Sequence, residues 1–264
     1  MSDLEFATTT SADGTVLGYF RRGSGPALVI THGSIATKEQ WIPASESLAE
    51  HFTVLAYDRR GRGQSGDASR YSIQDEVADI AAMMAVAGPG ANLLGHSYGA
   101  LCTLAYARQH GLAGGALVAF EPPLAVAGAV AGERLPAYEQ LIEAGDLDQA
   151  LEYALLNFVR VPAEAIPFIR ETPLWGACVP LTPTWTRELQ EIDGLGDDLT
   201  QYAEIGDATH LIAGTATTPF LYQSAHDLVA VIPGATVTDI DGGDHFAHLA
   251  DPAGFARVVS DVIG

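Results

Sequence analysis

The sequence predicts an α/β protein, with a mostly parallel central sheet, helices on both faces, and a helical segment inserted between two strands. Two observations carry this prediction. Short apolar, β-like runs alternate with segments of helical periodicity through most of the 264 residues. Between residues 122 and 206 this alternation stops, and helical patterns interrupted by prolines replace it. A chain of this length with 48% hydrophobic residues can bury one large core.

The strands are expected in the following order. Residues 4–9 and 16–21 form an opening hairpin that turns at Asp13-Gly14. The later strands are short and apolar, as is typical of strands buried on both faces. They are predicted at 27–31, 53–57, 91–94, 115–120, 209–213 and 235–240. The intervening helices are predicted at about 40–50, 74–87, 98–110, 220–231 and 252–263.

Residues 122–206 are predicted to form a helical cap on a core made of residues 1–121 and 207–264. The stretch 146–156 has helical periodicity, and several prolines follow it. The cap also carries large aromatic side chains. We expect Phe158, Trp175 and Trp185 to line a substrate pocket, and Phe168 is a further candidate. Packing of the cap onto the core explains these aromatic residues equally well, so both interpretations stay open.

Composition narrows the classes of partner. The formal net charge is −20, from 33 acidic residues against 13 Lys and Arg. Such a surface repels phosphate backbones and anionic membrane surfaces, so neither nucleic acid nor a membrane is an expected partner. A small-molecule substrate is expected instead, and a homodimer is compatible with the sequence. The acidity itself is explained by solubility.

Cysteine usage and the N-terminus indicate the compartment. Cys102 and Cys178 are the only cysteines, too few for a disulfide framework and typical of a reducing environment. The first residues include Asp3 and Glu5 and do not have the pattern of a signal peptide. A cytoplasmic protein is therefore predicted. The sequence shows no ligand set with metal-binding spacing, so neither a metal nor an organic cofactor is expected.

The stretch Gly95-His96-Ser97-Tyr98-Gly99 lies between a predicted strand and a predicted helix. Side chains collide in so tight a turn, and glycines two residues to either side of Ser97 remove the collision. The serine then lies at a helix N-terminus, where free N–H groups favour a developing negative charge. Ser97 is therefore predicted to be a nucleophile; the alternative is an incidental tight turn.

A second motif, His32-Gly33-Ser34, ends the strand predicted at 27–31. Attack on a carbonyl creates an oxyanion, which requires two fixed donors. The backbone N–H groups of Tyr98 and Ser34 are the expected pair. His32 is then expected to orient this loop and not to act as the base. An ordinary strand-ending turn is the alternative interpretation of this motif.

The base is expected in the segment Asp241-Gly242-Gly243-Asp244-His245-Phe246-Ala247-His248. This glycine-containing loop follows the last strand and brings an imidazole over the serine. His245 directly follows the loop and is preferred to His248, which is expected to begin the descent to the next helix. The remaining histidines lie within or beside predicted helices and strands, where a surface or core role is ordinary.

Together these motifs resemble the α/β-hydrolase superfamily. The resemblance also includes Tyr57-Asp58-Arg59-Arg60-Gly61-Arg62-Gly63-Gln64-Ser65, and it covers almost the whole chain, with the cap as the variable part. It implies the α/β-hydrolase fold and the chain order serine, acid, histidine. It also implies a structural role for the segment around Asp58, so Asp58 is not expected to be catalytic.

The acid departs from the usual pattern of that family. Members commonly place an aspartate three residues beyond a glycine after the penultimate strand, and here that position holds Thr217. Some α/β-hydrolases, including a branch of the haloalkane dehalogenases, place the acid after the strand that follows the nucleophile's helix. Glu121 occupies that position, and its extra methylene lets it reach His245. Glu121 is therefore the predicted acid, and Thr217 is expected to contribute little.

Other assignments of the acid stay open. Glu121 is alternatively a surface residue at the start of the cap, and Asp241 and Asp227 are the fallback acids. Asp244 is adjacent to His245 and would have to fold back on its own backbone.

The leading functional hypothesis is a serine hydrolase that cleaves a carboxylic ester or thioester of a small, largely apolar substrate through an acyl-enzyme. Two alternatives remain. One is a lyase or cyclase of the same fold that processes C–C bonds. The other is a receptor that binds a small apolar ligand without catalysis.

Overall fold

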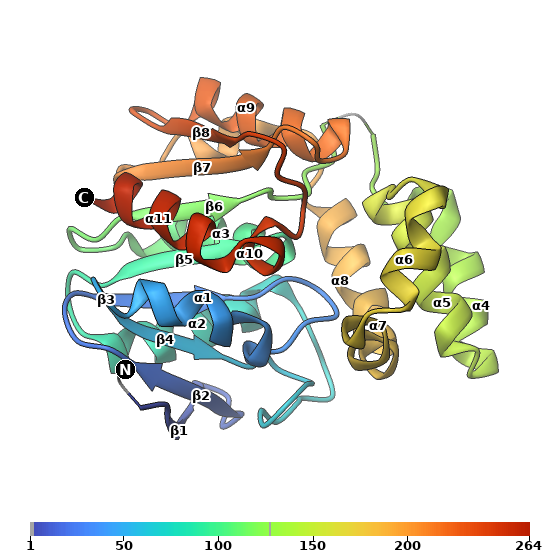
Figure 1. Cartoon of the computed structure of the whole chain (residues 1–264), viewed down its shortest axis with the longest axis horizontal. Helices are drawn as coiled ribbons and strands as arrows, with labels where there is room; N and C mark the ends of the chain where they lie inside the picture. Colours follow the sequence, from blue (N-terminus) through green and yellow to red (C-terminus); the bar gives the residue numbers. More distant parts are fainter. Residues whose placement is uncertain (1–2, 127) are drawn as a thin grey trace.

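A computed structural model describes residues 3–126 and 128–264 of the chain. Eight strands form one sheet in the order β1-β2-β4-β3-β5-β6-β7-β8 (Figure 1). β1 and β2 pair antiparallel, β2 joins β4 antiparallel, and all later neighbours pair parallel. The bounds are β1 (Glu5–Thr10), β2 (Val16–Arg22), β3 (Ala27–Thr31), β4 (Thr53–Tyr57), β5 (Asn92–His96), β6 (Leu117–Phe120), β7 (Thr209–Gly214) and β8 (Thr236–Ile240).

Helices cover both faces of this sheet. One face carries α1 (Ile42–Leu48) and α11 (Pro252–Ile263), with the short α10 (Ala247–Ala250) beside them (Figure 1). The other face carries α2 (Ile73–Ala87), α3 (Tyr98–His110) and α9 (Pro219–Val231). The predicted fold class, a mostly parallel sheet flanked by helices, is confirmed.

The strands divide their side chains between two hydrophobic clusters because successive residues point to opposite faces. In β3, Val29 packs with α2 and α3, whereas Leu28 and Ile30 pack with α1 and α11. In β5, Leu93 and Leu94 divide in the same way. Burial on both faces explains why these strands have nearly continuous apolar sequences.

Between β6 and β7 the chain forms a group of helices at one end of the sheet (Figure 1, right). They are α4 (Leu135–Ala144), α5 (Leu147–Ala154), α6 (Ile166–Arg170), α7 (Pro173–Cys178) and α8 (Thr182–Gly194). A single π-helical turn, Leu155–Val159, continues α5 and ends at Arg160 in the left-handed conformation, with φ 64°. Turns of this kind recur at functional sites. This one brings Leu155, Phe158 and Val159 toward the core.

Local sequence explains where the boundaries differ from the predicted ones. The helix expected at about 40–50 is split into a 3₁₀ turn, Lys38–Trp41, and α1, which has Pro43 in its first turn. Near the C-terminus, the Asp251 carboxylate accepts a hydrogen bond from the Gly254 N–H and caps α11, so α11 begins as a helix separate from α10.

Among the described residues, none of the helices combines the length and the apolar character that a membrane span requires.

Candidate active site

Ser97 lies at the turn between β5 and α3, with φ 54° and ψ −126°. This region of backbone conformation is costly for a residue with a side chain, and such strain is concentrated at functional sites. Tyr98 is the first residue of α3, so its backbone N–H has no acceptor within the helix. The turn therefore presents a hydroxyl and a free donor side by side.

The two glycines around Ser97 are required by close backbone approach. A Cβ atom on Gly95 would lie 2.6 Å from the Gly99 carbonyl oxygen and the Ala100 Cα. A Cβ atom on Gly99 would lie 2.9 Å from the carbonyl carbon of His32 and closer still to two carbonyl oxygens of the β3 loop. The spacing noted in the sequence thus reflects the packing of α3 against β3 and β5.

Gly99→Ala is accordingly expected to displace the turn and to lower the free energy of unfolding by more than about 2 kcal/mol, because the obstructing atoms are backbone. Gly176→Ala is the matched control. A Cβ atom there meets nothing within 4 Å, and Gly176 lies within α7, so a small gain in stability is expected. Urea denaturation of both variants measures the difference. Equal stability of the two variants would contradict this explanation of the glycines.

His245 and Glu121, which are 124 residues apart, form a buried pair. The His245 Nδ1–H donates to Glu121 Oε2 at 2.6 Å. The Glu121 side chain is fully buried, and His245 is 8% exposed. Donation from Nδ1 leaves the Nε2 lone pair free, which is the tautomer that a general base requires. The backbone of Glu121 has φ 48°, in the left-handed region, which is strained for a residue other than glycine. This strained conformation accompanies the contact between the Glu121 side chain and His245.

Two further donors hold the Glu121 carboxylate. The backbone N–H of Gly214 donates to Oε1 at 2.8 Å, and the Thr217 hydroxyl donates to Oε2 at 2.8 Å. Thr217, which stands at the usual position of the family's acid, is thus part of the hydrogen-bond network around Glu121, a contact that the sequence did not indicate.

The fallback acids have other partners. Asp241 interacts with the Thr215 hydroxyl, and Asp227 accepts from the side chain of Gln223. Asp244 accepts from the backbone N–H of Phe246. Among the carboxylates of the described residues, the one that contacts the His245 imidazole belongs to Glu121.

Ser34 borders the same chamber as Ser97, and it follows a loop that His32 holds in place. The His32 ring accepts from the Arg59 backbone N–H at Nε2, at 3.0 Å, and lies 2.8 Å from the Gly33 carbonyl at Nδ1. These partners define a neutral tautomer with the proton on Nδ1. Burial, together with the nearby Arg59 charge, lowers the pKa of His32 well below its usual value. His32 is thus a structural residue of this loop, as its position in the sequence predicts.

A buried ionic cluster ties this loop to α8. The Arg59 guanidinium donates to the Gly33 carbonyl at 3.2 Å, pairs with Glu76 at 2.6 Å and reaches Glu188 of α8 at 2.9 Å. Arg62 also pairs with Glu188. Burial raises the pKa of Glu188, but Arg59 and Arg62 outweigh burial and lower it. The sequence motif marked this arginine-rich segment, but it gave no sign of Glu188, which lies 129 residues from Arg59.

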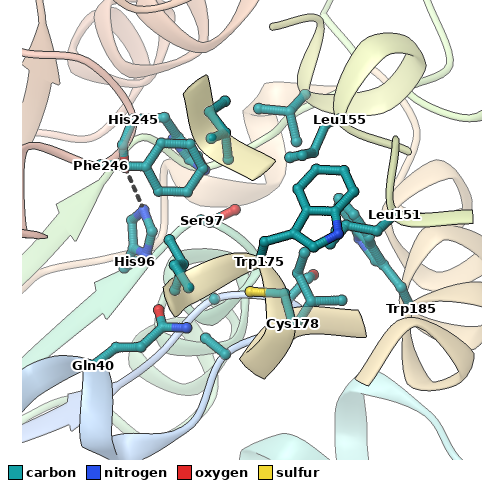
Figure 2. Close-up of a pocket in the computed structure, with 17 residues that line it drawn as sticks. Gln40, His96, Ser97, Leu151, Leu155, Trp175, Cys178, Trp185, His245 and Phe246 are labelled. Carbon is teal, nitrogen blue, oxygen red and sulfur yellow. Dashed lines mark hydrogen bonds between the residues drawn. The ribbon is translucent and has the colours of Figure 1, made fainter. Parts of the chain in front are cut away.

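Two further histidines support the His245 loop. His96 Nε2 lies 3.0 Å from the His245 carbonyl oxygen (Figure 2, dashed line), and its ring centroid is 4.5 Å from that of His248. His248 stacks on Trp41 at 4.6 Å, and both of its ring nitrogens are buried without a partner among the described residues. Burial, reinforced by neighbouring imidazoles, lowers the pKa of His96 well below its usual value and that of His248 to about 3. Both rings are therefore neutral and structural.

The site opens into three spaces. The inner chamber, about 50 Å³, is bounded by Ser34, Ser97 and His245 and by side chains of the helices between β6 and β7, including Trp175. Figure 2 shows the Ser97 hydroxyl turned toward this space, between Trp175, Leu155 and Phe246. A side chamber of about 20 Å³ also touches Ser97, and an outer groove of about 850 Å³ reaches His245 from the surface.

The aromatic side chains expected at the pocket border these spaces. Trp175 borders the inner chamber, Phe158 borders the side chamber, and Trp185 borders both. All three are also buried, and Phe158 and Trp185 pack edge to face at 6.0 Å. Phe168 differs, since it is 74% exposed and borders the outer groove. Lining and packing are therefore not exclusive alternatives for these residues.

Within the described residues, no group of three or more His, Cys, Asp or Glu side chains is arranged to hold a metal ion. Cys102 and Cys178 are both buried free thiols. Burial raises the pKa of Cys102 well above its usual value and that of Cys178 to about 11, so neither thiol has the character of a nucleophile.

The fold and this arrangement define a class of protein. Residues 28–258 match the model of the alpha/beta hydrolase family, and the chain belongs to that family. A relative in Mesorhizobium japonicum, a 2-(acetamidomethylene)succinate hydrolase, is 26% identical over 255 residues, which cover 92% of this chain and 89% of that protein. Relatives of this chain are thus named as hydrolases.

Solved structures show the same fold. An alpha/beta hydrolase from Sphaerobacter thermophilus is 30% identical, with a TM-score of 0.87, and the match covers 98% of this chain and 100% of that one. The enol-lactonase from Burkholderia xenovorans is 23% identical, with a TM-score of 0.74, over 98% of this chain and 99% of that one.

Proposed function

We propose that this protein is a serine hydrolase that cleaves an ester, or a thioester, of a small and largely apolar substrate through an acyl-enzyme. The observation that carries the proposal is that His245, paired with Glu121 at 2.6 Å, borders the same apolar chamber as a serine at a strained turn. Nucleophile, base and orienting acid are the parts that acyl transfer to serine requires.

The residues divide the proposed reaction in the following way. His245 Nε2 takes the proton of Ser97 Oγ as the oxygen attacks the acyl carbon, and the same nitrogen then protonates the leaving group. Glu121 holds the imidazole in the required tautomer and stabilises the imidazolium. The backbone N–H groups of Tyr98 and Ser34 bind the oxyanion. In the second half, His245 activates a water molecule that releases the acid and regenerates Ser97.

The lining of the chambers supports a neutral substrate. Of the described residues that border the inner and side chambers, none is a lysine, arginine, aspartate or glutamate. A succinate derivative, such as the one in the name of the Mesorhizobium relative, carries two carboxylates, and burying them without a cation is costly. We therefore infer a substrate class that differs from the one in that name.

A fluorophosphonate probe is expected to label the wild-type protein at Ser97 and to leave Ser97→Ala unlabelled, because the probe reports a serine activated by its base. Intact-mass spectrometry gives the readout, and hydrolysis of acyl esters of graded length is measured beside it. Ser97→Ala should lower kcat by roughly 10⁶-fold.

Other outcomes identify the alternatives. Turnover of the true substrate by Ser97→Ala would support an acid–base lyase or cyclase. A wild-type protein that binds apolar ligands but is neither labelled nor active would support a receptor.

A further inference from the structure

The inner chamber and the outer groove are neighbours of very different size. They share the bordering residues Gln40, Val159, Ile169, Leu174, His245 and Phe246, so the two spaces meet at His245, the proposed general base. The inner chamber is about 50 Å³ and the groove about 850 Å³. One water molecule needs roughly 10–15 Å³ on this scale, so the chamber holds about four heavy atoms.

The two spaces also differ in which catalytic groups they touch. The inner chamber borders Ser97 and Ser34, whereas the groove borders His245 and Thr217 but neither of the two serines. In acyl transfer, the acyl carbon bonds to the nucleophile, its oxygen faces the oxyanion donors, and the leaving group lies at the imidazole that protonates it. The acyl part of a substrate thus belongs with Ser97 and Ser34, and the leaving group belongs on the His245 side.

Resting on the function proposed above, we propose that the substrate is an ester of a short acyl group with a long apolar alcohol. The inner chamber takes the acyl group of two to four carbons, and the outer groove takes the alcohol chain. The reaction consumes water, breaks the bond between the acyl carbon and the alcohol oxygen, and releases a short carboxylic acid and the alcohol.

The walls of the groove fit an apolar chain. Val161, Ala165, Phe168 and Leu181 face it from the cap, and Leu249 and Ala250 face it from the core. Phe168, which is 74% exposed, adds a large apolar surface to this wall of the groove.

The charged residues at the groove argue against an anionic leaving group. Glu39 and Asp244 border it, and no lysine or arginine does so among the described residues. Lys38 pairs with Glu39 at 2.9 Å, but its ammonium is buried against Asp58. A thioester of a phosphate-bearing carrier would place its negative charge beside these carboxylates, so an uncharged alcohol is the better occupant.

Two isomeric esters test the assignment. Octyl acetate and ethyl octanoate have the same atoms and nearly the same hydrophobicity, but they place the long chain on opposite sides of the ester bond. We expect kcat/KM for octyl acetate to exceed that for ethyl octanoate by at least about a hundredfold, because six extra acyl carbons do not fit a chamber of this size.

Equal values, or a preference for ethyl octanoate, would overturn the proposal. If Ser97 is labelled by the fluorophosphonate and 4-nitrophenyl acetate is hydrolysed but octyl acetate is not, the hydrolase function stands and the groove assignment fails. If Ser97 is not labelled and no ester is cleaved, the proposed function itself fails.

A matched pair of variants on α7 locates the alcohol chain. Ala177 is exposed and borders the groove, whereas its neighbour Gly176 is exposed and does not. Ala177→Trp should lower the ratio of kcat/KM for octyl acetate to that for ethyl acetate by about tenfold or more, and Gly176→Trp should leave this ratio unchanged. An unchanged ratio in Ala177→Trp, or the same fall in both variants, would overturn the placement.

Discussion

Glu121→Gln is expected to fold normally and to lower kcat by about four orders of magnitude. The glutamine keeps the size of the side chain, but its amide is neutral and cannot stabilise the imidazolium. Its NH₂ group can also donate to Nδ1 of His245, which would favour the wrong tautomer. In the native protein this nitrogen donates to the carboxylate at 2.6 Å. Steady-state kinetics on the best ester from the graded screen provides the measurement, with circular dichroism as the check on folding.

Thr217 makes this prediction more specific. Its hydroxyl lies 2.8 Å from the same Glu121 oxygen that contacts His245, so an aspartate at position 217 lies within reach of the imidazole. The double variant Glu121→Gln/Thr217→Asp is expected to recover at least a hundredfold of the lost activity. Thr217→Val alone removes one supporting hydrogen bond and should cost about tenfold or less.

Asp227→Asn provides the control for these variants. The Asp227 carboxylate accepts from Gln223 and not from His245, so kcat should not change. Near-full activity of Glu121→Gln would refute the assignment of the acid. A double variant no more active than Glu121→Gln would refute the proposed geometry at position 217.

Acidification is expected to destabilise the protein steeply below pH 6.5. His32, His96 and His248 are buried, and burial depresses the pKa of each, to about 3 for His248. Between the folded and unfolded values the unfolded chain binds protons that the folded protein does not. The free energy of unfolding therefore falls as the pH falls, by about 1.4 kcal/mol per pH unit for each histidine.

Three such histidines together predict a loss of about 4 kcal/mol per pH unit between pH 6 and pH 5. Stabilities of single domains are roughly 5–15 kcal/mol, so a large share of the free energy of unfolding should be lost by about pH 5. Glu188, whose pKa is lowered by Arg59 and Arg62 against the effect of burial, adds to the loss only below its usual value of 4.5. Urea denaturation at half-unit intervals of pH measures the slope.

The variant His248→Phe removes one of the three histidines that make the free energy of unfolding depend on pH. Its two ring nitrogens are buried without partners among the described residues, so a phenyl ring in the same stack should raise stability by about 1 kcal/mol at pH 7 and reduce the slope by about one third. Phe255→Leu, in the same aromatic cluster, is the control and should lower stability without changing the slope. A slope near zero in the wild type would show that these rings do not resist protonation.

The sequence by itself predicted where along the chain the strands and their flanking helices lie. The inner strands are buried on both faces, and helices such as α2 and α11 are buried on one, so burial leaves a pattern in the local sequence. The turn at Ser97 was readable for a similar reason. Gly95 and Gly99 meet backbone atoms within a few residues or in the adjacent strand, and only a residue without a side chain fits there. The pairing of Glu121 with His245 was predicted from the resemblance to α/β-hydrolases that place their acid after the strand following the nucleophile's helix.

Only the tertiary structure decided how distant groups combine. Thr217 donates to Glu121, 96 residues away in the sequence, and Glu188 of α8 accepts from Arg59, 129 residues away. The ring cluster of Trp41, His96 and His248 brings together three segments of the chain. Such contacts leave no periodic signal, because a hydrogen bond or ring stack requires one partner in one orientation. The small chamber at Ser97 and the long groove at His245 likewise form where the helices between β6 and β7 meet the end of the sheet. Their sizes depend on how closely these helices approach the sheet, and no local sequence pattern shows that spacing.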